Sequence, residues 1–147
     1  MLANPGVPED LIEGDDWCFE MKWDGYRALA AVKHGRVKLV SRNGKDMTED
    51  FPELQELAVL APEGSILDGE IVALDGSARP SFSLLQQRVS HRRKKRPRQA
   101  QAINLNFMLF DPLQLPYGKD GKLRNLIPEP YVDRRKYLED AVTEGQY

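Results

Sequence analysis

Apolar and polar side chains alternate along the first part of the chain with a period of two residues, which is typical of β-strands. The alternation predicts strands over residues 17–22, 26–34 and 36–41. Gly25 interrupts it after the first strand, where a glycine can adopt a backbone conformation that other residues avoid. His34 and Gly35 supply a turn signal between the other two strands, so we expect an antiparallel hairpin there.

Apolar residues recur at helical spacing in later stretches. Thr48 is a fair N-cap for a helix that runs to Leu60, with Pro52 in its first turn. Ser81 can cap a second helix through Val89. A final helix is predicted over residues 131–142.

Two further apolar runs predict strands over residues 65–74 and 103–110, and Asp111-Pro112 is expected to end the second of them. Residues 114–130 predict a polar loop rich in proline and glycine. Strands and helices are mixed without strict β-α-β alternation. This order favours an α+β fold with a largely antiparallel, twisted sheet and flanking helices.

The composition is that of one soluble globular domain of 147 residues, with 41% apolar and 30% charged residues. No apolar run is long enough to span a membrane, and the N-terminus lacks the pattern of a signal peptide. The single cysteine, Cys18, is expected to pack as a small buried hydrophobe. The two histidines occur without a Cys/His cluster, so no metal site is assigned. Because the formal net charge is −2, any nucleic-acid surface must be a local patch.

Lys22 has the strongest candidate chemistry, because it ends the first predicted strand beside the turn at Asp24-Gly25. A lysine amine with its ordinary pKa of about 10.4 is protonated at pH 7, and only the neutral amine is a nucleophile. Partial burial and a nearby arginine such as Arg27 would both favour that neutral form. The alternative interpretation of residues 20–27 is a hairpin with charged turn residues.

Three other segments carry candidate binding residues. Glu70, in Leu67-Asp68-Gly69-Glu70, accepts a hydrogen bond from a ligand hydroxyl in one interpretation and faces outward at a bulge in the other. Arg42, beside the Asn43-Gly44 turn, either approaches a phosphate or ribose or is a solvated turn residue. Phe107 and Phe110 should point to opposite faces of their strand, so at most one of them is expected to stack on a base.

In this order, the four segments resemble the nucleotidyltransferase (adenylation) domain of ATP-dependent DNA ligases, and in particular the ligase module of bacterial end-joining proteins of the ligase D type. The resemblance extends from about Asp16 to about Val142. The supporting segments are residues 42–44, 80–88 and 134–138. It implies an ATP-grasp-like domain, with residues 1–16 as an entry segment and residues 17–147 as a partial adenylation domain without an oligonucleotide-binding domain.

The resemblance implies a role for each candidate residue. Lys22 would attack the α-phosphate of ATP to form lysyl-AMP, with Mg²⁺ assisting the departure of pyrophosphate. The adenylate would then pass to the 5′-phosphate of nicked or broken duplex DNA. The implied nucleotide contacts are Glu20 to the adenine amino group, Arg27 and Glu70 to the ribose, Arg42 to ribose or phosphate, and Phe110 stacked on adenine. Asp24 and Gly25 would shape the turn.

The later lysine-containing segments of the family are missing from this sequence. We therefore expect the isolated chain to adenylate poorly or not at all. An exposed sheet edge or apolar face should favour self-association or pairing with a complementary C-terminal segment. The expected location is the bacterial cytoplasm, with nucleoid association in function and no membrane partner.

A basic run at residues 91–98 lies in a predicted loop, residues 90–101. Its DNA-contact candidates are Arg92, Arg93, Lys94, Lys95 and Arg96. The alternative is a mobile, solvated loop. Two other functions also stay open: an RNA ligase or capping-type nucleotidyltransferase, and a truncated, non-catalytic fragment that binds nucleotide or DNA.

Overall fold

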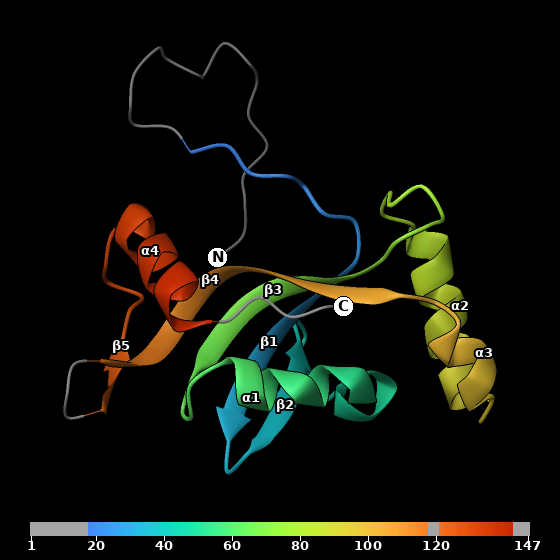
Figure 1. The fold of residues 1–147 in the computed structure, drawn as a ribbon, viewed down its shortest axis with the longest axis horizontal. Coiled ribbons are helices and arrows are strands. Elements are labelled where there is room, and N and C mark those ends of the chain that lie inside the picture. The colour runs from blue at the N-terminus through green and yellow to red at the C-terminus, as the bar shows by residue number, and fades with distance from the viewer. Residues whose placement is uncertain (1–17, 118–120, 143–147) are drawn as a thin grey trace.

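The computed structural model describes residues 18–117 and 121–142, so the predicted entry segment, residues 1–16, lies outside the described residues. A five-stranded antiparallel sheet has the order β2-β1-β3-β4-β5 (Figure 1). The strands are β1 (Tyr26–Lys33), β2 (Arg36–Ser41), β3 (Ile66–Ala73), β4 (Leu105–Tyr117) and β5 (Lys122–Asn125). The helical elements are η2 (Thr48–Asp50), η3 (Pro52–Glu56), α1 (Leu57–Leu60), α2 (Phe82–Arg93), α3 (Pro97–Gln101) and α4 (Tyr131–Ala141). The predicted α+β class is confirmed.

The β1–β2 hairpin forms where the sequence predicts it. His34 and Gly35 have φ values of 54° and 66°, the left-handed pair that a two-residue hairpin turn requires. The Glu63 carboxylate accepts hydrogen bonds from both backbone N–H groups, at 2.5 and 3.3 Å. The loop before β3 therefore holds the tip of the hairpin.

The hydrophobic core lies on one face of the sheet. Along β1, the buried side chains alternate with accessible ones. Figure 1 shows the η2–α1 segment along one side of the sheet, α4 near β4 and β5, and α2 with α3 at one end of β4. The core side chains include Ala28, Ala30 and Val32 from β1, Phe51 and Leu54, Leu85 from α2, and Leu138 from α4. The opposite face carries polar groups, because Arg27 and Glu70 are cross-strand partners on β1 and β3.

The prediction of a first strand over residues 17–22 is wrong for residues 18–22, which the structure describes. Residues 18–24 have no strand conformation, and β1 begins only at Tyr26. An alternating pattern forms a strand only beside a partner, and no described strand runs along residues 18–24. Cys18 is exposed rather than buried, and Phe19 and Met21 are 78% and 69% exposed.

The predicted helix over residues 48–60 is broken into η2, η3 and α1. Phe51 separates the first two pieces at φ −133° and ψ 63°, because a residue before proline is disfavoured in the α-helical region. Thr48 does not cap a helix with its side chain. Its hydroxyl instead accepts a hydrogen bond from the Leu39 N–H, at 3.0 Å, and ties this segment to β2.

Asp111-Pro112 does not end the fifth predicted strand, because β4 continues to Tyr117. Pro112 stands opposite Leu67, where the β3–β4 pairing shifts register, and such an irregularity tolerates a residue without an N–H donor. The predicted polar loop over residues 114–130 accordingly contains the end of β4 and all of β5. The final helix is confirmed as α4.

Both ends of the basic run are helical, and only residues 94–96 between them form a turn. Ser81 caps α2, accepting a hydrogen bond from the Leu84 N–H at 3.4 Å, and the helix extends four residues beyond Val89 to Arg93. Residues 94–96 turn the chain, and α3 follows.

Candidate functional site

Lys22 is exposed and lies just before β1, in the segment without strand conformation. The predicted partial burial at a strand end is therefore not found in this structure. Asp24 is exposed as well. The amine of Lys22 is thus accessible to a ligand that approaches the start of β1.

Gly25 meets a steric requirement rather than a conformational one. Its φ is not among the left-handed values of the described glycines, in contrast to the expectation from the sequence. A Cβ atom at this position would lie 2.1 Å from the Ile71 carbonyl oxygen. The Gly25 N–H donates to Glu70 Oε1 at 3.2 Å. Only glycine lets the backbone approach β3 this closely.

Arg27 and Phe110 come together on the polar face of the sheet. The guanidinium of Arg27 forms a two-point ion pair with Asp68, with Nε–Oδ1 at 3.0 Å and Nη2–Oδ2 at 2.6 Å. This bond raises the pKa of Arg27. The guanidinium carbon also lies 5.5 Å from the centre of the Phe110 ring. A base that stacks on this side of Phe110 must displace Arg27 or insert beside it.

Glu70 is a half-buried carboxylate surrounded by charge. Burial raises the pKa of Glu70, and Asp24 and Asp68 add to this rise. The Gly25 N–H and Arg27 act in the opposite direction, but the net pKa change is upward. Glu70 is therefore more easily protonated than an ordinary glutamate, and a hydroxyl or ammonium donor would compensate its burial.

Glu20 is held by helix α4. Its Oε1 atom accepts a hydrogen bond from the Tyr131 hydroxyl and lies 3.7 Å from Arg135 Nη1. Burial and the bond to Glu20 raise the pKa of Tyr131 to about 12, so the hydroxyl stays protonated and continues to donate. Among the described residues, no hydrogen bond to Glu20 Oε2 is found.

Tyr131, Arg135 and Asp68 were not among the predicted site residues. Tyr131 and Arg135 are four residues apart on α4, so they share one helix face. That spacing was readable in the sequence, but nothing in the sequence placed this face against Glu20. Asp68 was visible as a carboxylate in an apolar strand, and its pairing with Arg27 follows from the antiparallel register of β1 and β3.

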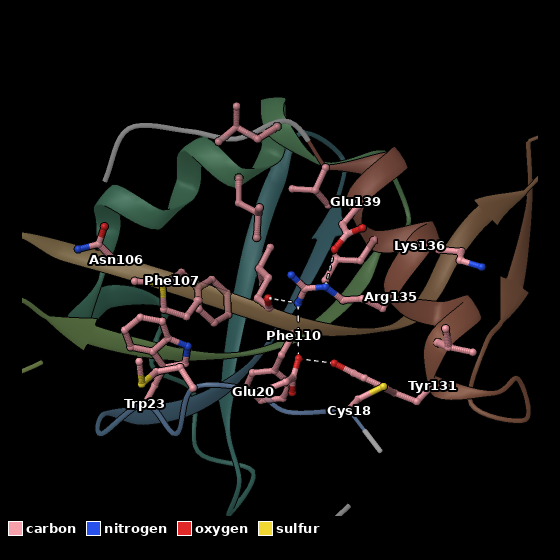
Figure 2. A pocket seen from close by; sticks show the side chains of 18 of the residues that line it. Cys18, Glu20, Trp23, Asn106, Phe107, Phe110, Tyr131, Arg135, Lys136 and Glu139 are labelled. Carbon is pink, nitrogen blue, oxygen red and sulfur yellow. Dashed lines mark hydrogen bonds and ion pairs between the residues drawn. The ribbon is translucent and has the colours of Figure 1, made fainter. Parts of the chain in front are cut away.

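A groove of about 860 Å³ opens beside β4 (Figure 2). Residues 18–21 and Trp23 form one wall and α4 forms another. Residues 106–110 of β4 and the apolar side chains of Leu54, Leu57 and Leu60 complete the lining. Glu20 and Phe110 both line the groove, which brings two predicted nucleotide contacts together. Lys22, Arg27, Glu70 and Arg42 are not among its lining residues. Phe107, expected on the opposite face from Phe110, packs against the core but also reaches the groove.

Arg42 is exposed in the turn after β2. Because Ser41 pairs with Ala28, Arg42 lies at the same end of the sheet as the start of β1. The structure therefore places Arg42 at the Lys22 end of the hairpin, directly after the strand that pairs with β1.

The described residues contain no group of three or more His, Cys, Asp or Glu side chains suited to a metal ion. Among the same residues, no helix is long and apolar enough to cross a membrane.

Comparison with known proteins identifies the family. The profile described as "ATP dependent DNA ligase domain" matches residues 1–147. The chain is 44% identical over 140 residues to the multifunctional non-homologous end joining protein LigD of Mycobacterium bovis, which covers 95% of this chain and 16% of that protein. It is 37% identical over 149 residues to DNA ligase C1 of Mycolicibacterium smegmatis, covering 99% of this chain and 40% of that protein.

A solved structure supports the same conclusion. The mycobacterial DNA ligase D complexed with ATP and MES superposes with a TM-score of 0.62 at 38% identity, covering 82% of this chain and 35% of that chain. The chain therefore spans less than half the length of each of these proteins. A matching profile, related sequences and a related structure all agree, and the chain belongs to the ATP-dependent DNA ligase domain family.

Proposed function

We propose that this chain supplies the nucleotide-accepting part of a DNA ligase, with Lys22 as the nucleophile. The neutral Nζ of Lys22 attacks the α-phosphorus of ATP, forming a P–N bond as the bond between the α-phosphorus and its bridging oxygen breaks. Pyrophosphate leaves, and solvent takes the amine proton. Membership of the ligase family carries this proposal, and the exposed position of Lys22 before β1 supports it.

The residues beside β1 and β4 suit an adenine nucleotide. Glu20 Oε2, which accepts no hydrogen bond from a described residue, is available to accept one from an amino group such as that of adenine. Phe110 offers an aromatic face for the base, and stacking contributes roughly 1–3 kcal/mol per base. Glu70 is available for a ribose hydroxyl, with Arg27 next to it across the strands and Arg42 near the start of β1.

Magnesium would meet no group of three or more carboxylates among the described residues. Because no described cluster of carboxylates is suited to a metal, Mg²⁺ would be held chiefly by the phosphate oxygens of the nucleotide. Its contribution would be to neutralise phosphate charge. The contacts proposed for Glu20 and Phe110 are to the base and do not depend on it.

The second and third steps of the proposed reaction concern DNA. The adenylate on Lys22 passes to a 5′-phosphate at a break, and a 3′-hydroxyl then displaces AMP to seal the strand. The relatives named for non-homologous end joining support duplex DNA as the substrate. None of the contacts among the described residues favours the competing proposal, an RNA ligase or capping-type enzyme, over a DNA ligase.

A chimaera separates these possibilities. The matching 140 residues of the M. bovis LigD protein would be replaced by this chain, and sealing of nicked DNA would be compared with sealing of nicked RNA. We expect sealing of DNA, with ATP but not GTP as the nucleotide. Preferential sealing of RNA, or equal use of GTP, would contradict the proposal. Nucleotide binding without any adduct would favour the non-catalytic alternative.

The outer edge of β4 is only partly paired: Arg135 Nη1 donates to the Leu109 carbonyl oxygen at 3.4 Å, and β5 covers one end. β5 pairs only with Gln114–Tyr117 of β4, so residues 105–113 have no described strand on their outer side. We propose that a complementary C-terminal segment of the ligase, or a second copy of the chain, pairs along this edge. Light scattering of the isolated chain, with and without that segment, would distinguish the two partners.

A further inference from the structure

Positive charge is concentrated in one part of the chain. The stretch from Gly76 to Phe110 contains 8 of the 21 lysines and arginines and none of the 23 aspartates and glutamates. The whole chain nevertheless has a formal net charge of −2. The positive charge of this stretch is therefore a local feature, as a polyanion-binding surface requires.

Three of the eight positively charged side chains interact with other residues of the chain. Arg88 is buried and pairs with Glu53. Arg92 donates from Nε to the Glu49 carbonyl oxygen at 3.2 Å, and Arg93 pairs with Asp50 at 2.7 Å. These three side chains hold α2 against the acidic segment at residues 49–53. Arg92 and Arg93, predicted DNA contacts, therefore have a structural role.

Four other cations remain at the α2–α3 corner: Lys94, Lys95, Arg96 and Arg98. All four side chains are exposed, and no described residue pairs with them. The corner is tightly folded, because the N–H groups of Lys95 and Arg96 donate to the carbonyls of Arg92 and His91 at 3.0 and 2.9 Å. The cations are thus presented at the hydrogen-bonded turn between α2 and α3 and at the start of α3, at one end of the sheet (Figure 1).

We propose that the corner cations Lys94, Lys95, Arg96 and Arg98 bind the sugar–phosphate backbone of the duplex DNA that the ligase acts on. This assignment of DNA as the polyanion rests on the proposed function. Clustered, exposed cations neutralise backbone phosphates and release counterions, which gives affinity without sequence preference. A membrane surface fits less well, because none of the exposed large apolar side chains of the described residues lies in this stretch.

The test uses the whole chain and a fluorescent nicked duplex, without ATP. The corner variant Lys94→Gln, Lys95→Gln, Arg96→Gln is compared with a variant of equal charge change at the hairpin tip, Lys33→Gln, Arg36→Gln, Lys38→Gln. We expect the corner variant to lose about tenfold in affinity at low salt, and the slope of log affinity against log salt to fall by about 2–3. The hairpin variant should lose less than about threefold.

The proposal would be overturned if the folded corner variant bound DNA as tightly as the parent, or if the hairpin variant lost as much DNA affinity. It would also be overturned if the parent bound duplex RNA more tightly than DNA, or bound phosphatidylserine vesicles in preference to DNA. Circular dichroism of both variants establishes that they are folded. DNA binding is measured without ATP, so a negative binding result does not bear on adduct formation at Lys22. Conversely, absence of the AMP adduct would not change the interpretation of the binding result.

Discussion

Glu20 shows how a single carboxylate is oriented by a helix far along the chain. The segment that contains it has no strand hydrogen bonds, so its position depends on a few side-chain contacts. Tyr131 and Arg135 supply two of them, both to Oε1. Figure 2 shows Arg135 between Glu20 and Glu139, with the Tyr131 hydroxyl directed at the same Glu20 carboxylate oxygen. The second oxygen of Glu20 is thereby left for a ligand.

Removing the Tyr131 hydroxyl should therefore weaken adenine recognition. We expect Tyr131→Phe to reduce ATP affinity by about fivefold, equivalent to about 1 kcal/mol, with little change for GTP. Competition binding in the chimaera measures both nucleotides. Arg36→Gln, at the distant hairpin tip, is the control for nonspecific effects. An unchanged ratio of ATP to GTP affinity in Tyr131→Phe would exclude this positioning role.

Neutralising Glu70 and neutralising Glu63 should change the stability of the fold in opposite directions. The folded-state pKa of Glu70 is raised above 4.5, so its contribution to stability falls as the pH rises above 4.5 and is unfavourable at pH 7. The pKa of Glu63 is lowered by its bonds to His34 and Gly35, so its favourable contribution exists at pH 7 and is lost as the pH falls below 4.5.

At pH 7, Glu70→Gln should therefore raise the melting temperature by on the order of 1 °C, and Glu63→Gln should lower it. Both differences from the parent should shrink in melts performed near pH 3. Destabilisation at pH 7 by Glu70→Gln would show that the charged form of Glu70 is required by the fold.

At the scale of elements, the close contact between Gly25 and β3 can be tested by one methyl group. Gly25→Ala places Cβ 2.1 Å from a backbone oxygen, so β1 and β3 must separate locally. We expect a loss of about 1–3 kcal/mol in the free energy of unfolding, measured by urea denaturation. Gly76→Ala is the matched control, because nothing lies within 4 Å of its Cβ position. Equal stability of the two variants would refute the steric argument.

Helix α4 is docked by a two-point ion pair. Arg134 and Asp111 are joined at 2.7 and 2.8 Å, and their side chains are only 11% and 17% exposed. Arg134→Ala leaves Asp111 largely buried and unpaired, so we expect a loss of about 2–3 kcal/mol by urea denaturation. Arg135→Ala, whose ion pairs are exposed, should cost less than about 1 kcal/mol. A similar loss of unfolding free energy in both variants would indicate that burial of the Arg134–Asp111 pair adds nothing to stability.

The elements that the sequence predicted well are those fixed by local patterns. The β1–β2 hairpin follows from alternation around His34-Gly35, and α2 follows from its Ser81 cap. The failures depend on contacts between distant residues. Pro112 is tolerated because the pairing of β3 and β4 shifts register beside it. Residues 18–22 have the alternating pattern of a strand but no described neighbouring strand to pair with.

At the scale of the whole molecule, the ordered set of short motifs was more informative than any single one. It indicated the ligase family, which the comparisons confirm. The arrangement of the predicted nucleotide contacts was only partly readable. Arg27 and Glu70 are adjacent by strand register, and Glu20 and Phe110 share a groove. The role of α4 as a wall of that groove depends on tertiary packing.

The most direct test of the proposed function is to identify the residue to which AMP becomes attached. The chimaera would be incubated with ATP and Mg²⁺, and intact mass and peptide mapping would be compared for the parent, Lys22→Ala and Lys33→Ala. We predict one AMP on the Lys22 peptide in the parent and in Lys33→Ala, and none in Lys22→Ala. The isolated chain should form little adduct. An adduct that persists in Lys22→Ala, or a folded chimaera that forms none, would contradict Lys22 as the nucleophile.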